Sequence, residues 1–187
     1  VEVSEEDVKE AILSFVGEYA QVPPMYSALK VNGKKLYELA REGKTVERKA
    51  RNVQIFSIEI LEIGLPRVRM SVHCSKGTYI RTLCHDVGQK LGCGGCMDKL
   101  LRTKVGVFEL ADTLKLAEID ALAKEGLVEE WIISEDELFE DYTKVWMKQE
   151  FDVVVHNGKK KKKKMFEEKL SSNTERLRVY DSKGEFI

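Results

Sequence analysis

The feature that most constrains this chain is a strand pattern that changes abruptly into a helix pattern near Gly77. From Arg67 to Cys74 apolar and polar residues alternate, which is typical of a strand with one buried face. From Tyr79 onward the apolar residues recur at helical spacing, until Gly92 ends the pattern. The sequence therefore predicts a strand, a sharp turn and a helix, with residues 78–81 at the helix N-terminus.

The sequence before this turn predicts further local structure. Ser4 with Asp7 predicts the N-cap of a first helix, and Gly17 is expected to be its C-cap. Asn32-Gly33 predicts a hairpin turn ahead of a short helix over residues 35–42. Residues 53–63 are rich in β-branched residues and predict a buried strand.

The sequence after Gly92 predicts a second set of elements. Residues 100–107 are expected to form a strand, and residues 116–124 a helix that Gly126 ends. Residues 151–158 and 177–184 are each expected to form a hairpin. The mixture predicts an α+β fold, with a change of composition near 110–145 that could separate two domains.

Charge is segregated along the chain although the net charge is only −1. Residues 22–52 hold eight basic and three acidic residues, residues 67–104 eight and two, and residues 109–152 four and fourteen. Such blocks form either complementary faces of one domain or a basic surface for a polyanion. The run Lys159–Lys164 is either a solvated turn or a contact to nucleic acid phosphate. No apolar stretch reaches the ~18 residues of a membrane span.

The cysteines favour a structural interpretation. Cys93 and Cys96 have C-x-x-C spacing, but a structural zinc site usually needs four ligands. A redox C-x-x-C motif lies at a helix N-terminus after a strand, whereas this one follows the end of a helix at Gly92. Small residues at a tight turn after a helix are the preferred explanation, with zinc or redox chemistry as the weaker alternative. A chain of this size needs no disulfides, so a reducing cytoplasm is expected.

The turn after Cys74 carries residues suited to chemistry. A helix N-terminus attracts anions, Tyr79 offers a flat face and a hydroxyl, and Arg81 offers a permanent cation that can hold a carboxylate or phosphate. The alternative is structural, with the tyrosine covering the rim of the core and the arginine in a surface ion pair. Spacing alone leaves both interpretations open.

Three segments together resemble one family. Ser-Lys-Gly-Thr-Tyr-Ile-Arg-Thr at 75–82, Pro-Met-Tyr-Ser-Ala-Leu-Lys at 24–30 and Leu-Gly-Cys-Gly at 91–94 resemble the TruB family of tRNA pseudouridine synthases, bacterial type. The resemblance is continuous over residues 10–110. It implies that residues 1–112 are the second half of the catalytic domain, with a mixed or antiparallel sheet and flanking helices. Residues 113–144 would then be linking helices, and residues 145–187 part of a PUA-like β domain.

The resemblance also implies an activity and a set of site residues. A uridine in the T-arm loop of tRNA is flipped out, detached at N1 and reattached through C5, without cofactor or metal. Tyr79 would lie against the target nucleotide, Arg81 would pair with the nucleophilic aspartate, and Leu100 would form the apolar floor. The residues implied to hold the RNA are Lys30, Lys34, Lys35, Arg41 and Arg102, four of them in a thumb-like loop over 22–52.

One departure from the family pattern concerns the nucleophile. The family's aspartate belongs to a Gly-x-Leu-Asp motif, and this chain contains none. Asp86 and Asp98 do not match its position and are expected to be solvated on a helix surface. The chain is therefore expected to be a C-terminal portion, inactive alone, whose exposed edges invite self-association, whereas the full-length enzyme is expected to be a monomer. The alternative function is a non-catalytic RNA-binding module on the same scaffold.

Overall fold

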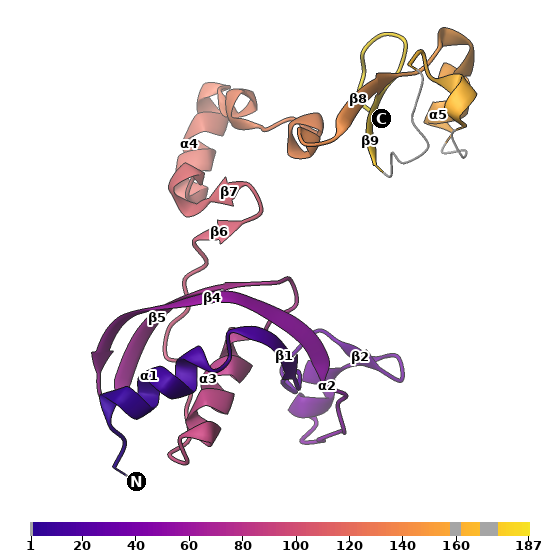
Figure 1. Cartoon of the computed structure of the whole chain (residues 1–187). Coiled ribbons are helices and arrows are strands. Elements are labelled where there is room, and N and C mark those ends of the chain that lie inside the picture. The colour runs from indigo at the N-terminus through magenta and orange to yellow at the C-terminus, as the bar shows by residue number, and fades with distance from the viewer. Residues whose placement is uncertain (1, 158–161, 169–175) are drawn as a thin grey trace. The chain divides into compact units, whose positions relative to one another are not determined.

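The computed structural model describes residues 2–157, 162–168 and 176–187, and these form two compact units, Val1–Leu101 and Arg102–Ile187. Each unit is described by itself below (Figure 1). The two units are defined by their compactness alone, so the domain boundaries expected after residues 112 and 144 stay predictions. In the described ranges, no helix is long and apolar enough to cross a membrane.

The first unit is built on a three-stranded antiparallel sheet. Its strands are β1 (Gly17–Gln21), β4 (Arg51–Gly64) and β5 (Arg67–Cys74), in the order β1-β4-β5. The alternation predicted for β5 is confirmed, because its residues are exposed and half-buried in turn. The prediction that β4 is a buried strand is wrong in part: Val53, Ile55 and Ile58 are buried while the outer face is open to solvent.

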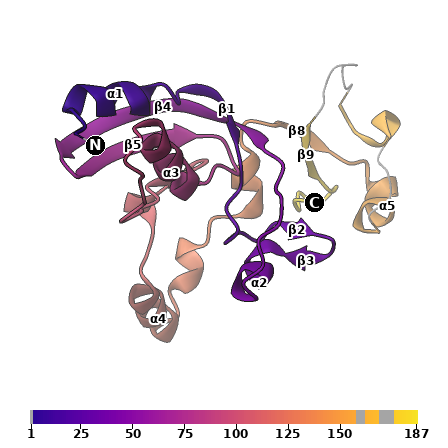
Figure 2. The same ribbon diagram turned by 90° about the horizontal axis from the view of Figure 1, so that it is seen from below.

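Two helices cover one face of this sheet (Figure 2). They are α1 (Glu5–Leu13) and α3 (Ile80–Lys90), and both contribute to one buried cluster. The cluster consists of Val8, Ala11, Ile12, Ile55, Ile58, Leu83 and Val87. Periodicity predicted both helices, because one apolar stripe on each must be buried against the sheet.

The start of α1 is confirmed and its predicted end is wrong. The Ser4 hydroxyl accepts from the Asp7 N–H at 3.1 Å, and the Asp7 carboxylate accepts from the Ser4 N–H at 3.0 Å. The helix ends at Leu13, however, with Ser14 as its C-cap. Gly17 instead begins β1 with a φ of 113°, a conformation that favours glycine.

Loss of this cap gives a measurable stability change. Ser4→Ala is expected to lower the free energy of unfolding by ~1 kcal/mol near neutral pH, measured by urea unfolding. The Ser4 hydrogen bonds lower the pKa of Asp7, so the stabilisation is present above the ordinary aspartate pKa of 3.8 and is lost as the pH falls through the lowered value. If the difference in the free energy of unfolding between wild type and Ser4→Ala grew as the pH fell, this assignment would be contradicted.

The thumb-like loop expected over 22–52 contains a small ordered unit. Strands β2 (Lys30–Val31) and β3 (Lys34–Lys35) pair antiparallel, and α2 (Leu36–Arg41) follows directly. The hairpin turn predicted at Asn32-Gly33 is confirmed, since both residues have positive φ. Leu36 is 1% exposed, and its N–H donates to the Leu29 carbonyl at 2.8 Å, which ties α2 to the segment before the hairpin.

The second unit begins with a short hairpin and a helix. Strands β6 (Lys104–Val105) and β7 (Phe108–Glu109) pair antiparallel. The single strand predicted over 100–107 is therefore wrong except at 104–105, because residues 100–103 are irregular and 106–107 form the turn of this hairpin. A 3-10 turn, Leu110–Asp112, leads to α4 (Leu116–Glu125). The predicted C-cap is confirmed, because Gly126 adopts the left-handed conformation with φ 74°.

The rest of the second unit packs around two parallel strands, β8 (Thr143–Trp146) and β9 (Leu177–Tyr180). Its buried cluster is Val145, Met147, Met165, Phe166 and Val179. The 3-10 helices are Val128–Trp131, Glu135–Phe139, Gln149–Phe151 and Lys163–Met165.

Of the two hairpins predicted for this unit, the first is wrong. Residues Asp152–His156 form helix α5, because a short β-branched run has no periodicity that separates strand from helix. The turn predicted after β9 is confirmed: Asp181 N–H donates to the Glu185 carbonyl at 2.9 Å, and Tyr180 bridges Phe186. The lysine run lies partly outside the described residues, at 159–161.

Candidate functional site

The turn between β5 and α3 is fixed by hydrogen bonds to the neighbouring strand. Ser75 N–H donates to the Gln54 carbonyl at 2.8 Å, and the Ser75 hydroxyl accepts from Gln54 N–H at 2.9 Å. The Thr78 hydroxyl donates to the Ser75 carbonyl at 2.9 Å, and Gly77 supplies a φ of 84°. The turn therefore places Tyr79 at the N-cap of α3 with a defined backbone.

A buried side chain from β1 also holds Tyr79. The Gln21 amide oxygen accepts from Tyr79 N–H at 2.7 Å, and the Gln21 amide nitrogen donates to the Tyr79 carbonyl at 3.1 Å. Gln21 is 1% exposed. Sequence reasoning missed this residue, and its only signal was a polar residue on the same strand face as Tyr19, two residues earlier.

Tyr79 is half-buried and Arg81 is exposed on the first turn of α3. Within the residues that the structure describes, the Arg81 guanidinium has no hydrogen bond or ion pair, so the surface ion pair weighed for it is not present. A free guanidinium at a helix N-terminus is suited to bind a carboxylate or a phosphate. The roles of both residues in a reaction stay predictions.

Leu100 and Arg102 lie in irregular backbone and are exposed, Leu100 at 57%. Leu100 belongs to the first unit, whereas Arg102 begins the second. A shallow hollow of the first unit is lined by residues of α1 and β4, and none of Tyr79, Arg81 and Leu100 is among them. The structure thus brings Gln21 to Tyr79 but does not by itself define a pocket with Leu100 as its floor.

The backbone after α3 folds back tightly onto the helix. Gly94 N–H donates to the Gly88 carbonyl at 3.0 Å, and a Cβ atom on Gly88 would lie 2.1 Å from the Gly95 nitrogen. This contact supports the tight-turn interpretation of the segment between Cys93 and Cys96. Both cysteines are exposed free thiols, and the described chain groups no three His, Cys, Asp or Glu side chains as metal ligands.

Two aspartates that were expected to be solvated are both engaged. Asp86 on α3 accepts a hydrogen bond from the Tyr19 hydroxyl, so its expected solvation is wrong. Burial, and then this hydrogen bond, raise the pKa of Tyr19. Asp98 lies 3.9 Å from the Arg67 guanidinium in an exposed ion pair. Asp86 therefore joins α3 to β1 through Tyr19 and is not an exposed surface group.

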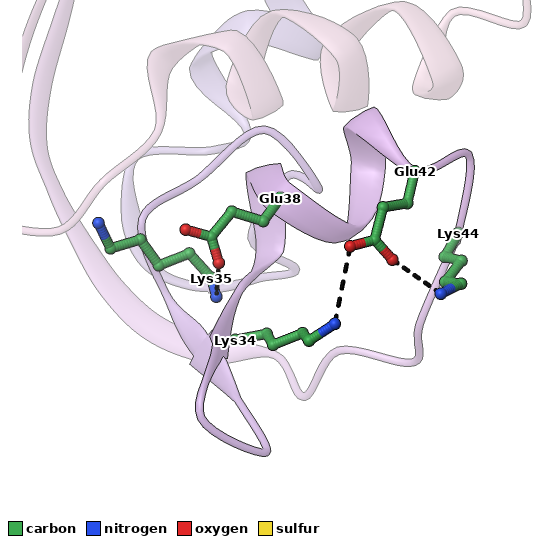
Figure 3. Close-up of polar contacts among 5 residues, drawn as sticks. All are labelled: Lys34, Lys35, Glu38, Glu42 and Lys44. Carbon is green, nitrogen blue, oxygen red and sulfur yellow. Dashed lines mark hydrogen bonds and ion pairs between the residues drawn. The ribbon is translucent and has the colours of Figure 1, made fainter.

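The predicted RNA-binding lysines differ in how free their charges are. Glu42 binds Lys44 at 2.7 Å and Lys34 at 3.7 Å, and the Lys44 hydrogen bond, followed by the Lys34 charge, lowers the pKa of the Glu42 carboxyl (Figure 3). Lys35 donates through its ammonium to the Tyr37 hydroxyl at 3.2 Å, and this bond raises the pKa of Lys35.

Two further predicted RNA-binding residues of this segment carry no carboxylate partner within the described ranges. The Arg41 guanidinium lies 5.3 Å from the centre of the Tyr37 ring, and Lys30 is exposed. In the described part of the chain neither Lys30 nor Arg41 is in an ion pair, unlike Lys34. These two charges are therefore more available to a polyanion than that of Lys34.

Sequence models of one family match most of the chain. Residues 1–80 match the TruB family pseudouridylate synthase (N terminal domain), and residues 81–140 match the tRNA pseudouridylate synthase B C-terminal domain. Together with the strand–turn–helix that carries Tyr79 and Arg81, these matches show that the chain belongs to the TruB family of pseudouridine synthases.

Curated relatives carry the name tRNA pseudouridine synthase B. The one from Lachnoclostridium phytofermentans is 48% identical over 183 residues, which cover 92% of this chain and 60% of that protein. The one from Clostridium acetobutylicum is 44% identical, covering 98% of this chain and 62% of that protein. The chain thus spans about 60% of the length of these relatives.

Solved structures share the fold. A chain of the crystal structure of a Cbf5-Nop10-Gar1 complex superposes with a TM-score of 0.72 at 27% identity, over 100% of this chain and 55% of that one. A chain of the archaeal box H/ACA sRNP Nop10-Cbf5 complex gives 0.67 at 26% identity, over 99% of this chain and 53% of that one. The expected α+β class is confirmed by these neighbours and by the mixed helices and sheet.

Proposed function

We propose that the protein containing this chain isomerises a uridine in the T-arm loop of tRNA to pseudouridine. The observation that carries the proposal is the fixed turn at 75–82 in a chain of the TruB family. It carries a half-buried tyrosine and an arginine that has no ion pair among the described residues. The names of its relatives support tRNA as the substrate, although this chain spans only about 60% of the length of those proteins.

The proposed chemistry assigns each side chain a role. Tyr79 lies against the flipped uracil, and Arg81 pairs with a nucleophilic aspartate outside residues 1–187, which keeps that carboxylate charged. The N1–C1′ bond breaks and a C5–C1′ bond forms. The proton on C5 leaves and N1 gains one, so atoms and charge balance without cofactor or metal. Leu100 is proposed as the apolar floor under the base.

The remaining parts of the chain have proposed roles as well. Residues 1–112 are the second half of the catalytic domain, 113–144 link it to the rest, and 145–187 are part of a PUA-like β domain. The buried cluster around β8 and β9 supports this last unit as a small separate core. The complete protein is proposed to act as a monomer in the cytoplasm.

Tritium release from tRNA transcribed with [5-³H]uridine tests the proposal, because the C5 hydrogen leaves only when the base is reattached. The complete gene product is expected to release one tritium per tRNA, and residues 1–187 alone are expected to release none. RNA binding by the complete product without any release would contradict the proposed activity and favour the non-catalytic RNA-binding module.

Neutralising the two available cations should weaken RNA binding. Lys30→Ala with Arg41→Ala is expected to lower the affinity of the complete gene product for a T-arm stem-loop and to reduce the slope of log affinity against log salt by about 2. Fluorescence anisotropy at several salt concentrations measures both quantities. Lys9→Ala is the matched control, because Lys9 is a partly exposed lysine of α1 paired with Glu6. An unchanged salt slope in the double variant would remove Lys30 and Arg41 from the RNA interface.

A further inference from the structure

A buried amide stands directly behind the residue proposed to contact the base. Both polar atoms of the Gln21 side chain are used on the backbone of Tyr79, one as acceptor at 2.7 Å and one as donor at 3.1 Å. A buried amide without partners destabilises a fold, and these two bonds give both polar atoms of Gln21, which is 1% exposed, a partner. The Gln21 side chain thus pairs with the Tyr79 backbone through one N–H···O bond in each direction, as two residues of neighbouring strands do.

We propose that Gln21 is a positioning residue for the uridine isomerisation: its amide fixes the backbone of Tyr79, and through it the directions of the Tyr79 ring and the Arg81 guanidinium. This inference rests on the proposed function and adds to it a residue from a different strand. The contact joins positions 58 residues apart in the sequence.

The N-terminus of α3 depends on Gln21 for this support. No side chain caps the helix at Tyr79, and the Tyr79 backbone is extended, with φ −98° and ψ 103°. The Tyr79 carbonyl accepts from Thr82 N–H at 3.0 Å and from Leu83 N–H at 3.1 Å. Hydrogen bonds within the helix therefore fix the carbonyl of Tyr79 and not its N–H. The Tyr79 N–H is held by Gln21. Loss of that acceptor would leave the Tyr79 N–H without this partner and loosen the point where the turn enters the helix.

Gln21 is itself held from behind by a second polar pair. Tyr19 lies two residues earlier on the same face of β1, and its hydroxyl donates to Asp86 on α3. The Gln21 amide also acts on Tyr19, because it opposes the rise in the pKa of Tyr19 caused by burial and by Asp86. The chain Asp86, Tyr19, Gln21, Tyr79 therefore runs from the middle of α3 to its N-terminus.

Gln21 also ends β1 where the basic segment begins. Val22, Pro23 and Pro24 follow it directly, and the prolines lack the N–H that could extend the strand. One residue thus joins the start of the proposed RNA-binding segment to the proposed catalytic turn. Correct geometry at that turn matters, since a displacement of about 1 Å can cost 10²-fold in rate.

The test uses the complete gene product, with Gln21→Met, Gln21→Glu and a control. Methionine keeps the length without hydrogen bonds, and glutamate keeps the acceptor for the Tyr79 N–H but loses the donor. Gln89→Met is the matched control, because Gln89 is exposed on α3. Gln21→Met is expected to lower the single-turnover rate of tritium release about 10- to 100-fold at saturating tRNA, with the tRNA Kd changed less than about 3-fold. Gln21→Glu is expected to retain part of the rate.

A second readout separates positioning from simple stability. Hydrogen exchange at the Tyr79 amide should accelerate in Gln21→Met and stay at the wild-type rate in Gln89→Met, at a temperature where circular dichroism shows each variant folded. A Gln21→Met protein that is folded and as fast as wild type would overturn the inference, as would a lower rate explained wholly by weaker tRNA binding. If Gln21→Met does not fold, a folded Gln21→Glu at the full wild-type rate overturns it equally. No tritium release by the wild type would overturn the proposed function instead.

Discussion

Replacing Arg81 with alanine is expected to reduce pseudouridine formation by the complete gene product about 10²- to 10³-fold, the usual effect of removing a group that stabilises charge at a reacting centre. The structure gives the reason for expecting little loss of stability. Arg81 is exposed on α3 and, across the described ranges, makes no hydrogen bond or ion pair. Its loss should therefore change the rate and leave urea unfolding within about 0.5 kcal/mol of wild type.

Two control variants sharpen this test. Arg81→Lys keeps the positive charge but loses the planar fork that binds a carboxylate at two points, so an intermediate rate is expected. Arg69→Ala removes an exposed arginine of β5 that lies 3.4 Å from Glu62, and it is expected to react at the wild-type rate. An Arg81→Ala protein as fast as Arg69→Ala would show that Arg81 has no part in the reaction.

Adding a methyl group at Gly88 is expected to destabilise the first unit by about 3 kcal/mol, the upper part of the range for overpacking. A Cβ atom there would lie 2.1 Å from the Gly95 nitrogen and 2.2 Å from the Gly94 carbonyl carbon. Both are backbone atoms, so no side chain can rotate away to make room. The loop would have to move, and with it the Gly94 hydrogen bond to the Gly88 carbonyl.

Gly64→Ala is the matched control for Gly88→Ala. Gly64 ends β4, its φ is not positive, and a Cβ atom there would meet nothing within 4 Å. Urea unfolding should be followed by circular dichroism, because both tryptophans, Trp131 and Trp146, lie in the second unit. Equal unfolding midpoints for the two variants would mean that the loop does not pack against Gly88 in solution.

Local signals predicted the elements that carry the candidate site. The alternation of β5 and the periodicity of α3 each require only that one face be buried, so a single sequence is enough to find them. The turn at Asn32-Gly33 could be predicted equally well, because few residue types adopt a positive φ. Where the periodicity was short, as in Asp152–His156, the same reasoning took a helix for a strand.

The support of the site could not be predicted from the sequence, because it depends on contacts between distant segments. Nothing near Gln21 shows that its amide binds Tyr79, and nothing near Asp86 shows that it accepts from Tyr19. The sequence alone shows Gly88 only as an unfavourable residue for a helix, whereas the structure shows that the backbone of Gly94 and Gly95 packs against it. Motif residues are found from the chain, whereas the residues that hold them in place are found from the fold.

The most direct test of the account is to map pseudouridine at nucleotide resolution in an unmodified tRNA transcript after reaction with the complete gene product. The account predicts one pseudouridine, at a uridine of the T-arm loop, which disappears with Arg81→Ala and persists with Arg69→Ala. Pseudouridine that persists with Arg81→Ala, or that forms only outside the T-arm, would contradict the claim that the turn after β5 isomerises the T-loop uridine.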